Sequence, residues 1–203
     1  MLDNSTARKS VAKIIDPFAK KLVSAGVSPD TVTVLGALLS SLVAFAFIPS
    51  GHFLLAALLF GFCSLSDLLD GTMARMTNTA SKWGAFLDST LDRIVDASLL
   101  IALMLYFQRS EPKQNLVLIA LVVALVSSQT ISYVRAKAES LGAQASVGIA
   151  ERAERSLITW LGLVMAGLGL NVLPFAIYAL AAVSVITVVQ RFLYIRKQLI
   201  VQS

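Results

Sequence analysis

The sequence predicts an all-α integral membrane protein with six transmembrane helices and an N-terminal interfacial amphipathic helix. Of its 203 residues, 57% are hydrophobic, whereas a soluble domain has about 45–50%. The mean hydropathy is +0.78, and the apolar excess is concentrated in six long blocks. Each block is near the ~20 residues that a helix needs to cross a bilayer. The chain therefore has the composition and patterning of a multi-pass helical membrane protein.

The six apolar blocks define the predicted spans, with boundaries good to about three residues. They are Thr31–Pro49, Phe53–Ala74, Gly84–Phe107, Asn115–Ala136, Ser156–Leu173 and Phe175–Tyr194. Ser28-Pro29-Asp30 supplies an N-cap, a proline at the first helical position and an early acidic residue for the first span. Pro49-Ser50-Gly51 and Leu173-Pro174 indicate tight turns between spans. Close helix packing in the fifth span would be permitted by its small residues Gly162, Ala166, Gly167 and Gly169.

Residues 1–30 are predicted to form an N-terminal interfacial segment, and residues 31–203 the membrane domain. Apolar residues in this segment recur at helical spacing, and lysines occupy other parts of the helical wheel, as in a helix lying on anionic lipid. The apolar positions are Val11, Ile14, Ile15, Phe18 and Leu22. Pro17 would interrupt or kink such a helix. A basic leader that only fixes the topology is an equally good interpretation.

Lys and Arg residues determine the predicted orientation, because they favour the cytoplasmic side of a membrane. Of the 17 Lys and Arg residues, only Arg109 and Lys113 lie on one side of the predicted spans, and all the others lie on the opposite side. Both termini are therefore expected in the cytoplasm, in a multi-pass protein of the cell membrane. The net charge of +5 is attributed to this asymmetry and not to a nucleic-acid partner.

Four carboxylates lie in two stretches that otherwise have the pattern of membrane helices: Asp67 and Asp70, then Asp88 and Asp92. A charged side chain near mid-bilayer costs roughly 2.5–3.5 kcal/mol on insertion scales, so four together require compensation. Residues three or four apart share one helix face. Two such faces turned toward one another would form an all-oxygen cage for hard divalent cations. The pattern predicts a metal-dependent enzyme; the alternatives are carboxylates that pair with arginine or line an ion-transport path.

Small residues accompany these acids on the same helix faces. Gly71 and Ala74 follow Asp70, and Gly84 precedes Asp88. Positions with little or no side chain leave room for a bulky group near the backbone. A nucleotide or diphosphate held on metal ions would fill that space. Arg75 lies beside it, where its planar guanidinium could meet phosphate oxygens.

The combined pattern D-x2-D-G-x2-A-R-x8-G-x3-D-x3-D resembles that of the CDP-alcohol phosphotransferases. Every fixed place of the pattern is filled, by Asp67, Asp70, Gly71, Ala74, Arg75, Gly84, Asp88 and Asp92. The resemblance extends over nearly the whole chain in the six-span topology. It implies transfer of a substituted phosphate from a CDP-linked donor, here CDP-diacylglycerol, to an alcohol with release of CMP. It also implies a homodimer.

The resemblance assigns roles to these residues. Asp67, Asp70 and Asp88, with Asp92 as a fourth member, would bind two divalent ions, Mg²⁺ or Mn²⁺. Asp92 is also predicted to accept the proton of the attacking hydroxyl. The CDP donor would be bound by Asp67, Gly71, Ala74, Arg75 and Gly84. Asp96, one turn after Asp92, is placed outside the metal set, as an acid that supports the ligands or as a partner for Arg93.

The acceptor alcohol must be inferred from residues outside the shared pattern. Ser89 and Leu91-Asp92-Arg93 resemble the inositol-phosphate-using members of actinobacteria and archaea, as does the run from Ser132 to Glu139. A phosphorylated acceptor needs fixed cations, and bidentate guanidinium contacts suit a phosphate dianion. The predicted acceptor-phosphate site consists of Ser132, Arg135, Arg152, Arg155 and Arg191.

Other interpretations of these residues stay open. Basic residues at helix ends are also expected from topology alone, and Lys137, Arg196 and Lys197 are interpreted in this way. Glycerol 3-phosphate is the alternative acceptor within the same class of enzyme. An aspartate-lined ion transporter and a structural membrane subunit are the alternatives from other classes.

Overall fold

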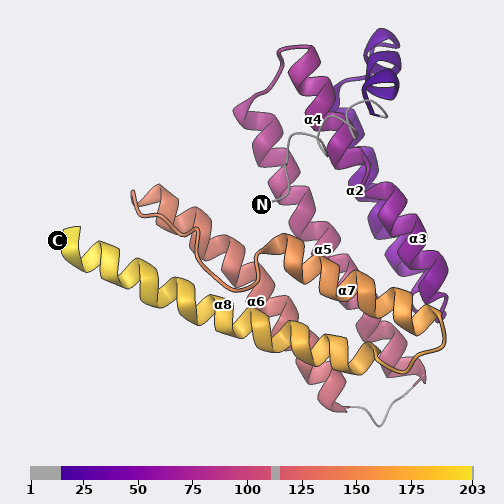
Figure 1. Cartoon of the computed structure of the whole chain (residues 1–203), viewed down its shortest axis with the longest axis vertical. Coiled ribbons are helices and arrows are strands. Elements are labelled where there is room, and N and C mark those ends of the chain that lie inside the picture. Colours follow the sequence, from indigo (N-terminus) through magenta and orange to yellow (C-terminus); the bar gives the residue numbers. More distant parts are fainter. Residues whose placement is uncertain (1–14, 111–114, 203) are drawn as a thin grey trace, which may run out of the picture. The chain divides into compact units, whose positions relative to one another are not determined.

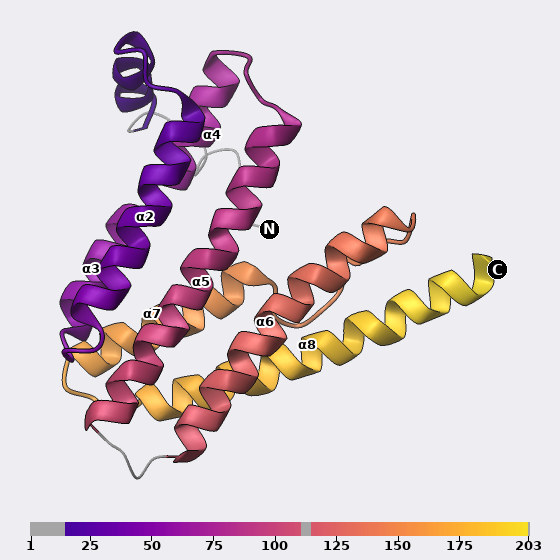
Figure 2. The same cartoon turned by 180° about the vertical axis from the view of Figure 1, so that it is seen from behind.

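The computed structural model describes residues 15–110 and 115–202, and this part of the chain contains helices and no strand. The first described helix covers residues 15–24. The others are α2 (Pro29–Phe47), α3 (Phe53–Cys63), α4 (Ser66–Met76), α5 (Lys82–Ser110), α6 (Asn115–Ser140), α7 (Arg152–Gly167) and α8 (Leu173–Gln202). Figures 1 and 2 show them from opposite sides. The predicted all-α class is confirmed.

Within residues 15–110 and 115–202, four helical stretches are long and apolar enough to cross a membrane. They are α2, the α3–α4 stretch over Phe53–Met76, α6, and α8 as far as Ile200. α7 has only 16 residues, which is short of the ~20 needed for a span. The first half of α5 carries three carboxylates, at Asp88, Asp92 and Asp96. The structure therefore contains four candidate spans where the sequence predicts six.

The second predicted span is divided into two helices. α3 ends at Cys63, residues 64–65 form a turn, and α4 begins at Ser66. Ser64 Oγ donates a hydrogen bond of 2.7 Å to the carbonyl of Gly61, and Ser66 Oγ donates one of 2.6 Å to that of Cys63. Hydroxyls that bond to carbonyls of the preceding turn compete with the backbone ladder and bend a helix. The interruption separates the apolar part of this stretch from the acidic part that begins at Asp67.

The predicted helix ends agree with the structure at the first span and differ at the fifth. Ser28 Oγ accepts a 3.1 Å hydrogen bond from the backbone N–H three residues later, which confirms the N-cap of α2. α7 ends at Gly167 and not at Leu173, because Gly169 has a φ of +88° and closes a Schellman motif. α8 then begins at Leu173, and Pro174 occupies its first turn, where proline is tolerated. The predicted turn at Leu173-Pro174 is therefore wrong by a few residues.

The chain divides into two compact units. The first contains the described residues through Val43 together with Leu58–Val95. Ala19, Val32 and Met73 form a buried cluster in this unit. The helix of residues 15–24 therefore packs with α2 and α4, the helices that carry Val32 and Met73.

The N-terminal interfacial helix is described only in its second part. Within that part, Ile15 is buried and Phe18 is 62% exposed, so one apolar side chain faces the protein and another is available to lipid. The helix continues through Pro17. Val11 and Ile14 lie outside the described residues, and the amphipathic helix as a whole stays a prediction.

The second unit contains Ala44–Ala57 and the described residues from Asp96 onward. In it α6 and α8 lie side by side, and α7 packs on α8. A Cβ on Gly162 would lie 2.8 Å from the Cβ of Ala176, and a Cβ on Gly167 would overlap the backbone of Leu54. These contacts confirm that small residues of the fifth predicted span permit close helix packing.

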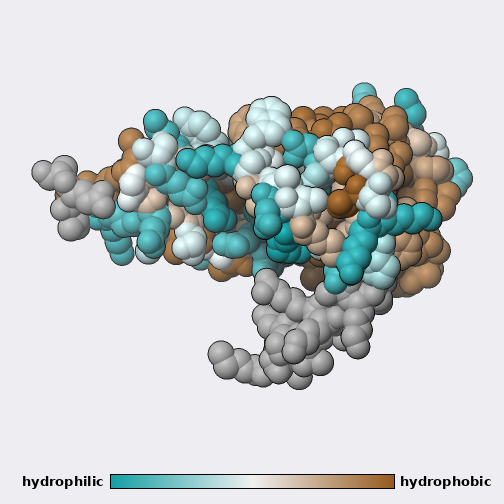
Figure 3. Space-filling model, turned by 90° about the horizontal axis from the view of Figure 1, so that it is seen from above, coloured by the Kyte–Doolittle hydropathy of each residue, from teal (hydrophilic) through white to brown (hydrophobic). Residues whose placement is uncertain are grey.

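Large apolar side chains lie on the outside of several helices. Phe62, Leu116 and Phe175 are 72%, 71% and 70% exposed, which is unusual for a soluble protein and expected for side chains that face lipid. Figure 3 shows one face of the molecule, on which hydrophilic side chains gather beside hydrophobic ones.

Candidate functional site

Three of the four predicted carboxylates come together in the first unit. One oxygen from each of Asp67, Asp70 and Asp88 lies within 4.8 Å of the others. Asp67 and Asp70 are one turn apart at the start of α4, and Asp88 lies in the second turn of α5. We call these three residues the acidic cluster. The helical spacing in the sequence therefore predicts the cluster correctly for these residues.

Asp70 is the most enclosed member of the acidic cluster. Its side chain is buried, and Thr33 Oγ1 on α2 donates a 2.5 Å hydrogen bond to its Oδ2. Asp67 is exposed and lies 3.4 Å from Ser66 Oγ. Three carboxylates at this separation repel one another unless a cation lies between them. Their all-oxygen donor set fits a hard divalent cation.

Asp92 does not join the 4.8 Å group. It lies one helical turn after Asp88 on α5 and forms a 3.9 Å ion pair with Nη2 of its neighbour Arg93. Only the other three predicted carboxylates belong to the group within 4.8 Å. The predicted metal and proton-acceptor roles of Asp92 stay predictions.

The glycines beside the acids have neighbours within ordinary van der Waals distance of the position that a Cβ would occupy. A Cβ on Gly71 would lie 3.4 Å from Nη1 of Arg75, whose Nη2 donates a 3.0 Å hydrogen bond to Thr72 Oγ1. Arg75 is thus folded over the Gly71 face of α4. Ala74, one turn after Asp70, is partly buried.

Asp30 and Thr33 on α2 are functional candidates that the sequence did not reveal as such. A Cβ on Gly84 would lie 3.6 Å from Asp30 Oδ1, so this carboxylate borders the small-residue surface of α5. Asp30 has the sequence pattern of an ordinary first-turn acid. Thr33 gives no signal at all, because its partner Asp70 is 37 residues away.

Arg191 is a buried cation in the second unit, with a relative exposure of 2%. Its Nε donates a 2.9 Å hydrogen bond to the carbonyl of Val147, and its Nη1 donates one of 2.9 Å to that of Ile131. Nη2 lies 3.8 Å from a carboxylate oxygen of Glu151. Arg191 therefore links α6, α8 and the loop of residues 141–151, which we call the 141–151 loop.

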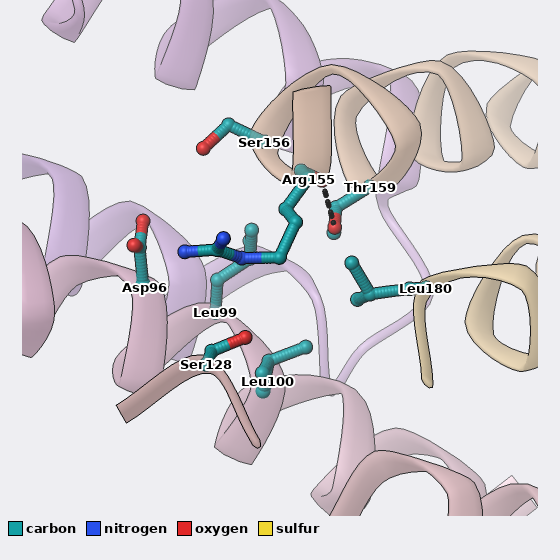
Figure 4. A pocket seen from close by; sticks show the side chains of 8 residues that line it. All are labelled: Asp96, Leu99, Leu100, Ser128, Arg155, Ser156, Thr159 and Leu180. Atoms are coloured by element: carbon teal, nitrogen blue, oxygen red, sulfur yellow. Dashed lines mark hydrogen bonds between the residues drawn. The ribbon is translucent and has the colours of Figure 1, made fainter. Parts of the chain in front are cut away.

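Arg155 is the second buried arginine, with a relative exposure of 5%. Its Nη1 donates a 2.9 Å hydrogen bond to the carbonyl of Ala150 in the 141–151 loop. Figure 4 shows its guanidinium extending toward Asp96 across a small cavity, with Ser128 beside it. The cavity has about 20 Å³, enough for roughly one water molecule.

The other residues of the predicted acceptor-phosphate site make the following contacts. Arg152 Nε lies 3.4 Å from Oδ2 of Asp96, which gives Asp96 a basic partner. Ser132 Oγ donates a 3.2 Å hydrogen bond to the carbonyl of Ser128 on its own helix. Arg135 is exposed and forms a 2.9 Å ion pair with Glu139.

Side chains of α8 hold the 141–151 loop at several points that the sequence did not predict. Gln198 accepts a 2.9 Å hydrogen bond from the backbone N–H of Gln144 and donates one of 2.8 Å to its carbonyl. Further along, Gln190 accepts from the N–H of Ile149 at 3.0 Å, and Thr187 accepts from that of Ala150 at 3.2 Å. Together with Arg191, these contacts fix the loop that leads into α7.

Residues 26–193 match the CDP-alcohol phosphatidyltransferase family. The chain is also 40% identical over 185 residues to the phosphatidylinositol phosphate synthase of Corynebacterium glutamicum, and the alignment covers 91% of this chain and 84% of the relative. The chain belongs to the CDP-alcohol phosphatidyltransferase family. It is therefore a transferase, and the family resemblance inferred from the aspartate pattern is confirmed.

Crystal structures of the phosphatidylinositol phosphate synthase of Mycobacterium tuberculosis have similar folds. The complex with manganese and citrate has a TM-score of 0.85 and 35% sequence identity, and covers 88% of this chain and 87% of that one. The structure with CDP-DAG bound has a TM-score of 0.86 and 35% identity, and covers 91% and 94%. The acidic cluster and the buried arginines both lie within the segment that matches the CDP-alcohol phosphatidyltransferase family.

Proposed function

We propose that this CDP-alcohol phosphatidyltransferase transfers the phosphatidyl group of CDP-diacylglycerol to inositol phosphate, giving phosphatidylinositol phosphate and CMP. The observation that carries the proposal is the acidic cluster, which has the donor set for a divalent cation and lies on the helices that carry Gly71 and Gly84. The relative from C. glutamicum is named a phosphatidylinositol phosphate synthase, which supports the choice of acceptor.

Asp67, Asp70 and Asp88 would hold the divalent cations, as Mg²⁺ or Mn²⁺. The manganese complex of the M. tuberculosis relative supports this assignment. Two bound cations would neutralise the diphosphate and stabilise the leaving oxygen of CMP. Thr33 would keep the carboxylate of Asp70 oriented by donating its hydroxyl hydrogen.

The CDP group of the donor would lie against α4 and α5. Asp67, Gly71, Ala74, Arg75 and Gly84 would line this donor site. The absence of side chains at Gly71 and Gly84 would let a nucleotide approach the helices closely, and the Arg75 guanidinium would bind phosphate oxygens. The CDP-DAG complex of the M. tuberculosis relative supports a donor of this kind.

The reaction would begin with proton removal from the acceptor. The hydroxyl oxygen of inositol phosphate attacks the β-phosphorus of CDP-diacylglycerol while its proton passes to the carboxylate of Asp92. The bond from the β-phosphorus to the bridging oxygen breaks, and that oxygen leaves with CMP. A positioned carboxylate that accepts this proton contributes typically 10²–10⁴-fold to the rate. Asp92 would also be the fourth residue around the divalent cations, although it is not one of the three carboxylates that lie within 4.8 Å of one another.

The phosphate of the acceptor would be held by Ser132, Arg135, Arg152, Arg155 and Arg191. Burial of Arg155 and Arg191 supports this site, because a buried guanidinium interacts with an anion more strongly than a solvated one. Each of them uses part of its five N–H donors on a loop carbonyl, and Arg191 also donates to the carbonyl of Ile131 in α6. The 141–151 loop would therefore position both arginines.

The number of membrane spans and their orientation are part of the same proposal. α5 and α7 would cross the membrane beside the four apolar stretches, giving six spans, with both termini and the site on the cytoplasmic side. The charged residues of α5 lower its hydropathy, and they belong to the proposed site. Charged residues within a spanning helix are expected at a functional site, so α5 can still be a span. The N-terminal helix would lie at the interface, and the homodimer implied by the family stays a prediction.

One assay tests the proposed function. The purified chain is given CDP-diacylglycerol with Mg²⁺ or Mn²⁺, and inositol phosphate, inositol, glycerol 3-phosphate and serine are offered separately while CMP is measured. CMP release with inositol phosphate alone is expected. Release with glycerol 3-phosphate alone would overturn the acceptor and keep the reaction type. Failure with every acceptor, while the protein conducts cations in vesicles, would contradict the transfer reaction itself.

A further inference from the structure

A groove lies between the C-terminal parts of α6 and α8, and its lining contains none of the residues assigned to the reaction. It has a volume of about 310 Å³ and is lined almost entirely by apolar atoms. Val134 and Leu141 line it from the α6 side, and Phe192 and Leu199 from α8. The residues recur every three or four positions on each helix, so the groove follows the helices over about two turns, or roughly 10 Å.

One small side chain, Ala138, lines the groove between the larger ones. Ala138 also belongs to a buried cluster with Ala143 and Ala145, against which Ile195 and Leu199 pack. The volume lies in the range of small-molecule sites, about 300–1,000 Å³.

Two basic side chains lie beside the apolar lining of this groove. Lys137 and Arg196 line it, and both are exposed. They lie three and four residues before the ends of the candidate spans, at Ser140 and Ile200. This position corresponds to the depth of lipid headgroups. Among the described residues, neither cation forms a hydrogen bond or ion pair.

We propose that this groove binds an anionic phospholipid that is not a substrate, with an acyl chain against Ala138 and the larger apolar side chains and the phosphate between Lys137 and Arg196. Basic pockets between transmembrane helices on the cytoplasmic side are known to bind anionic headgroups. The charge favours lipid over a second copy of the chain. A two-fold interface through this groove would place each pair of cations near the same pair of the partner.

The test uses the full-length protein in phosphatidylcholine vesicles. One set of vesicles contains a trace of photoactivatable phosphatidylglycerol, and the other contains a trace of photoactivatable phosphatidylcholine with the same acyl chains. Crosslinked peptides are mapped by mass spectrometry. Phosphatidylglycerol is expected to label residues 133–141 and 192–199 well above phosphatidylcholine. Each basic residue near an anionic lipid contributes about fivefold to affinity, so the double variant Lys137→Gln/Arg196→Gln should bind phosphatidylglycerol about 25-fold more weakly.

Two further variants test whether the labelling depends on the charges and the apolar lining of this groove. Lys197→Gln removes a neighbouring charge that lies outside this groove and should leave the labelling unchanged. Ala138→Phe fills part of the groove and should reduce labelling by both lipids, and a circular dichroism spectrum checks that it folds. Equal labelling by both lipids in the unaltered chain would overturn the proposal, as would a crosslink joining two chains through residues 133–141. None of these results depends on the CMP assay.

Discussion

Thr33 donates a 2.5 Å hydrogen bond to Asp70, the buried member of the acidic cluster. The same hydroxyl oxygen lies 3.1 Å from the carbonyl of Pro29 in the preceding turn of α2. The first turns of α2 thus control how one carboxylate of α4 is oriented. A hydrogen bond to a ligating carboxylate restricts its rotation and tunes its affinity for metal.

Replacing Thr33 with Val should weaken metal binding while the acidic cluster keeps all three carboxylates. Loss of such a supporting contact typically lowers metal affinity 10–100-fold. The affinity for Mn²⁺ is measured by electron paramagnetic resonance, and the metal dependence of CMP release is followed in parallel. Thr33→Ser retains the hydroxyl and should restore most of the affinity. Unchanged Mn²⁺ affinity in Thr33→Val would show that the hydrogen bond has no part in metal binding.

Asp88 and Asp92 should respond differently to conversion into Asn, although they lie on the same helix. Asp88→Asn removes a carboxylate of the acidic cluster and should weaken Mn²⁺ binding and abolish turnover. Asp92→Asn should lower kcat by about 10²–10⁴ and weaken Mn²⁺ binding less than Asp88→Asn does, because Asp92 lies outside the cluster. If Asp92→Asn weakens Mn²⁺ binding as much as Asp88→Asn does, then Asp92 is a metal ligand equal to the three of the cluster.

The acidic cluster could be predicted because its chemistry and its spacing are local. Asp67 and Asp70 share a helix face by helix periodicity alone, and the family pattern supplies Asp88. Thr33 could not be predicted, since its contact with Asp70 depends on how two helices pack. The end of α7 at Gly167 could not be predicted either, because an apolar sequence continues beyond Gly169, the glycine whose positive φ stops the helix.

The contacts of the two buried arginines could not be predicted from the sequence for the same reason. The sequence predicts Arg155 and Arg191 as cations for a phosphate, and the structure adds that both donate to carbonyls of the 141–151 loop. Those contacts join residues far apart in the chain, such as Val147 and Arg191. The partners of Gln198 are equally remote, so no pattern of neighbouring residues could have predicted that α8 holds the loop.

Arg191→Gln should destabilise the protein as well as weaken its binding of inositol phosphate. The change leaves the carbonyls of Val147 and Ile131 without a buried donor, and each unsatisfied group costs about 1–3 kcal/mol. A lower thermal unfolding temperature in detergent is expected, by several degrees. Arg135→Gln is the matched control, because its exposed pair with Glu139 contributes only about 0.3–0.5 kcal/mol. Equal unfolding temperatures for the two variants would refute the structural role of Arg191.

Gln198→Leu should loosen the start of the 141–151 loop without disturbing the helices. The amide of Gln198 makes two hydrogen bonds with the backbone of Gln144, and leucine retains the volume while removing both. Hydrogen–deuterium exchange should become faster in the peptide that contains Gln144 and stay the same in α7. Gln198→Glu keeps the acceptor and loses the donor, so intermediate exchange is expected. Unchanged exchange in Gln198→Leu would show that other contacts hold the loop.

Gly148 lies where the loop touches α8, and replacing it with Ala should be destabilising for two separable reasons. Its φ of +136° is rarely adopted by residues with a side chain, and an added Cβ would lie 2.5 Å from Cγ2 of Thr187. Such strain costs on the order of 1–3 kcal/mol. Thr187→Ser removes the methyl group and keeps the hydroxyl that accepts from the N–H of Ala150. In a double-mutant cycle of unfolding temperatures, Gly148→Ala should therefore be less harmful with Ser at position 187. Additive effects would mean that the backbone conformation alone, and not contact with α8, requires glycine.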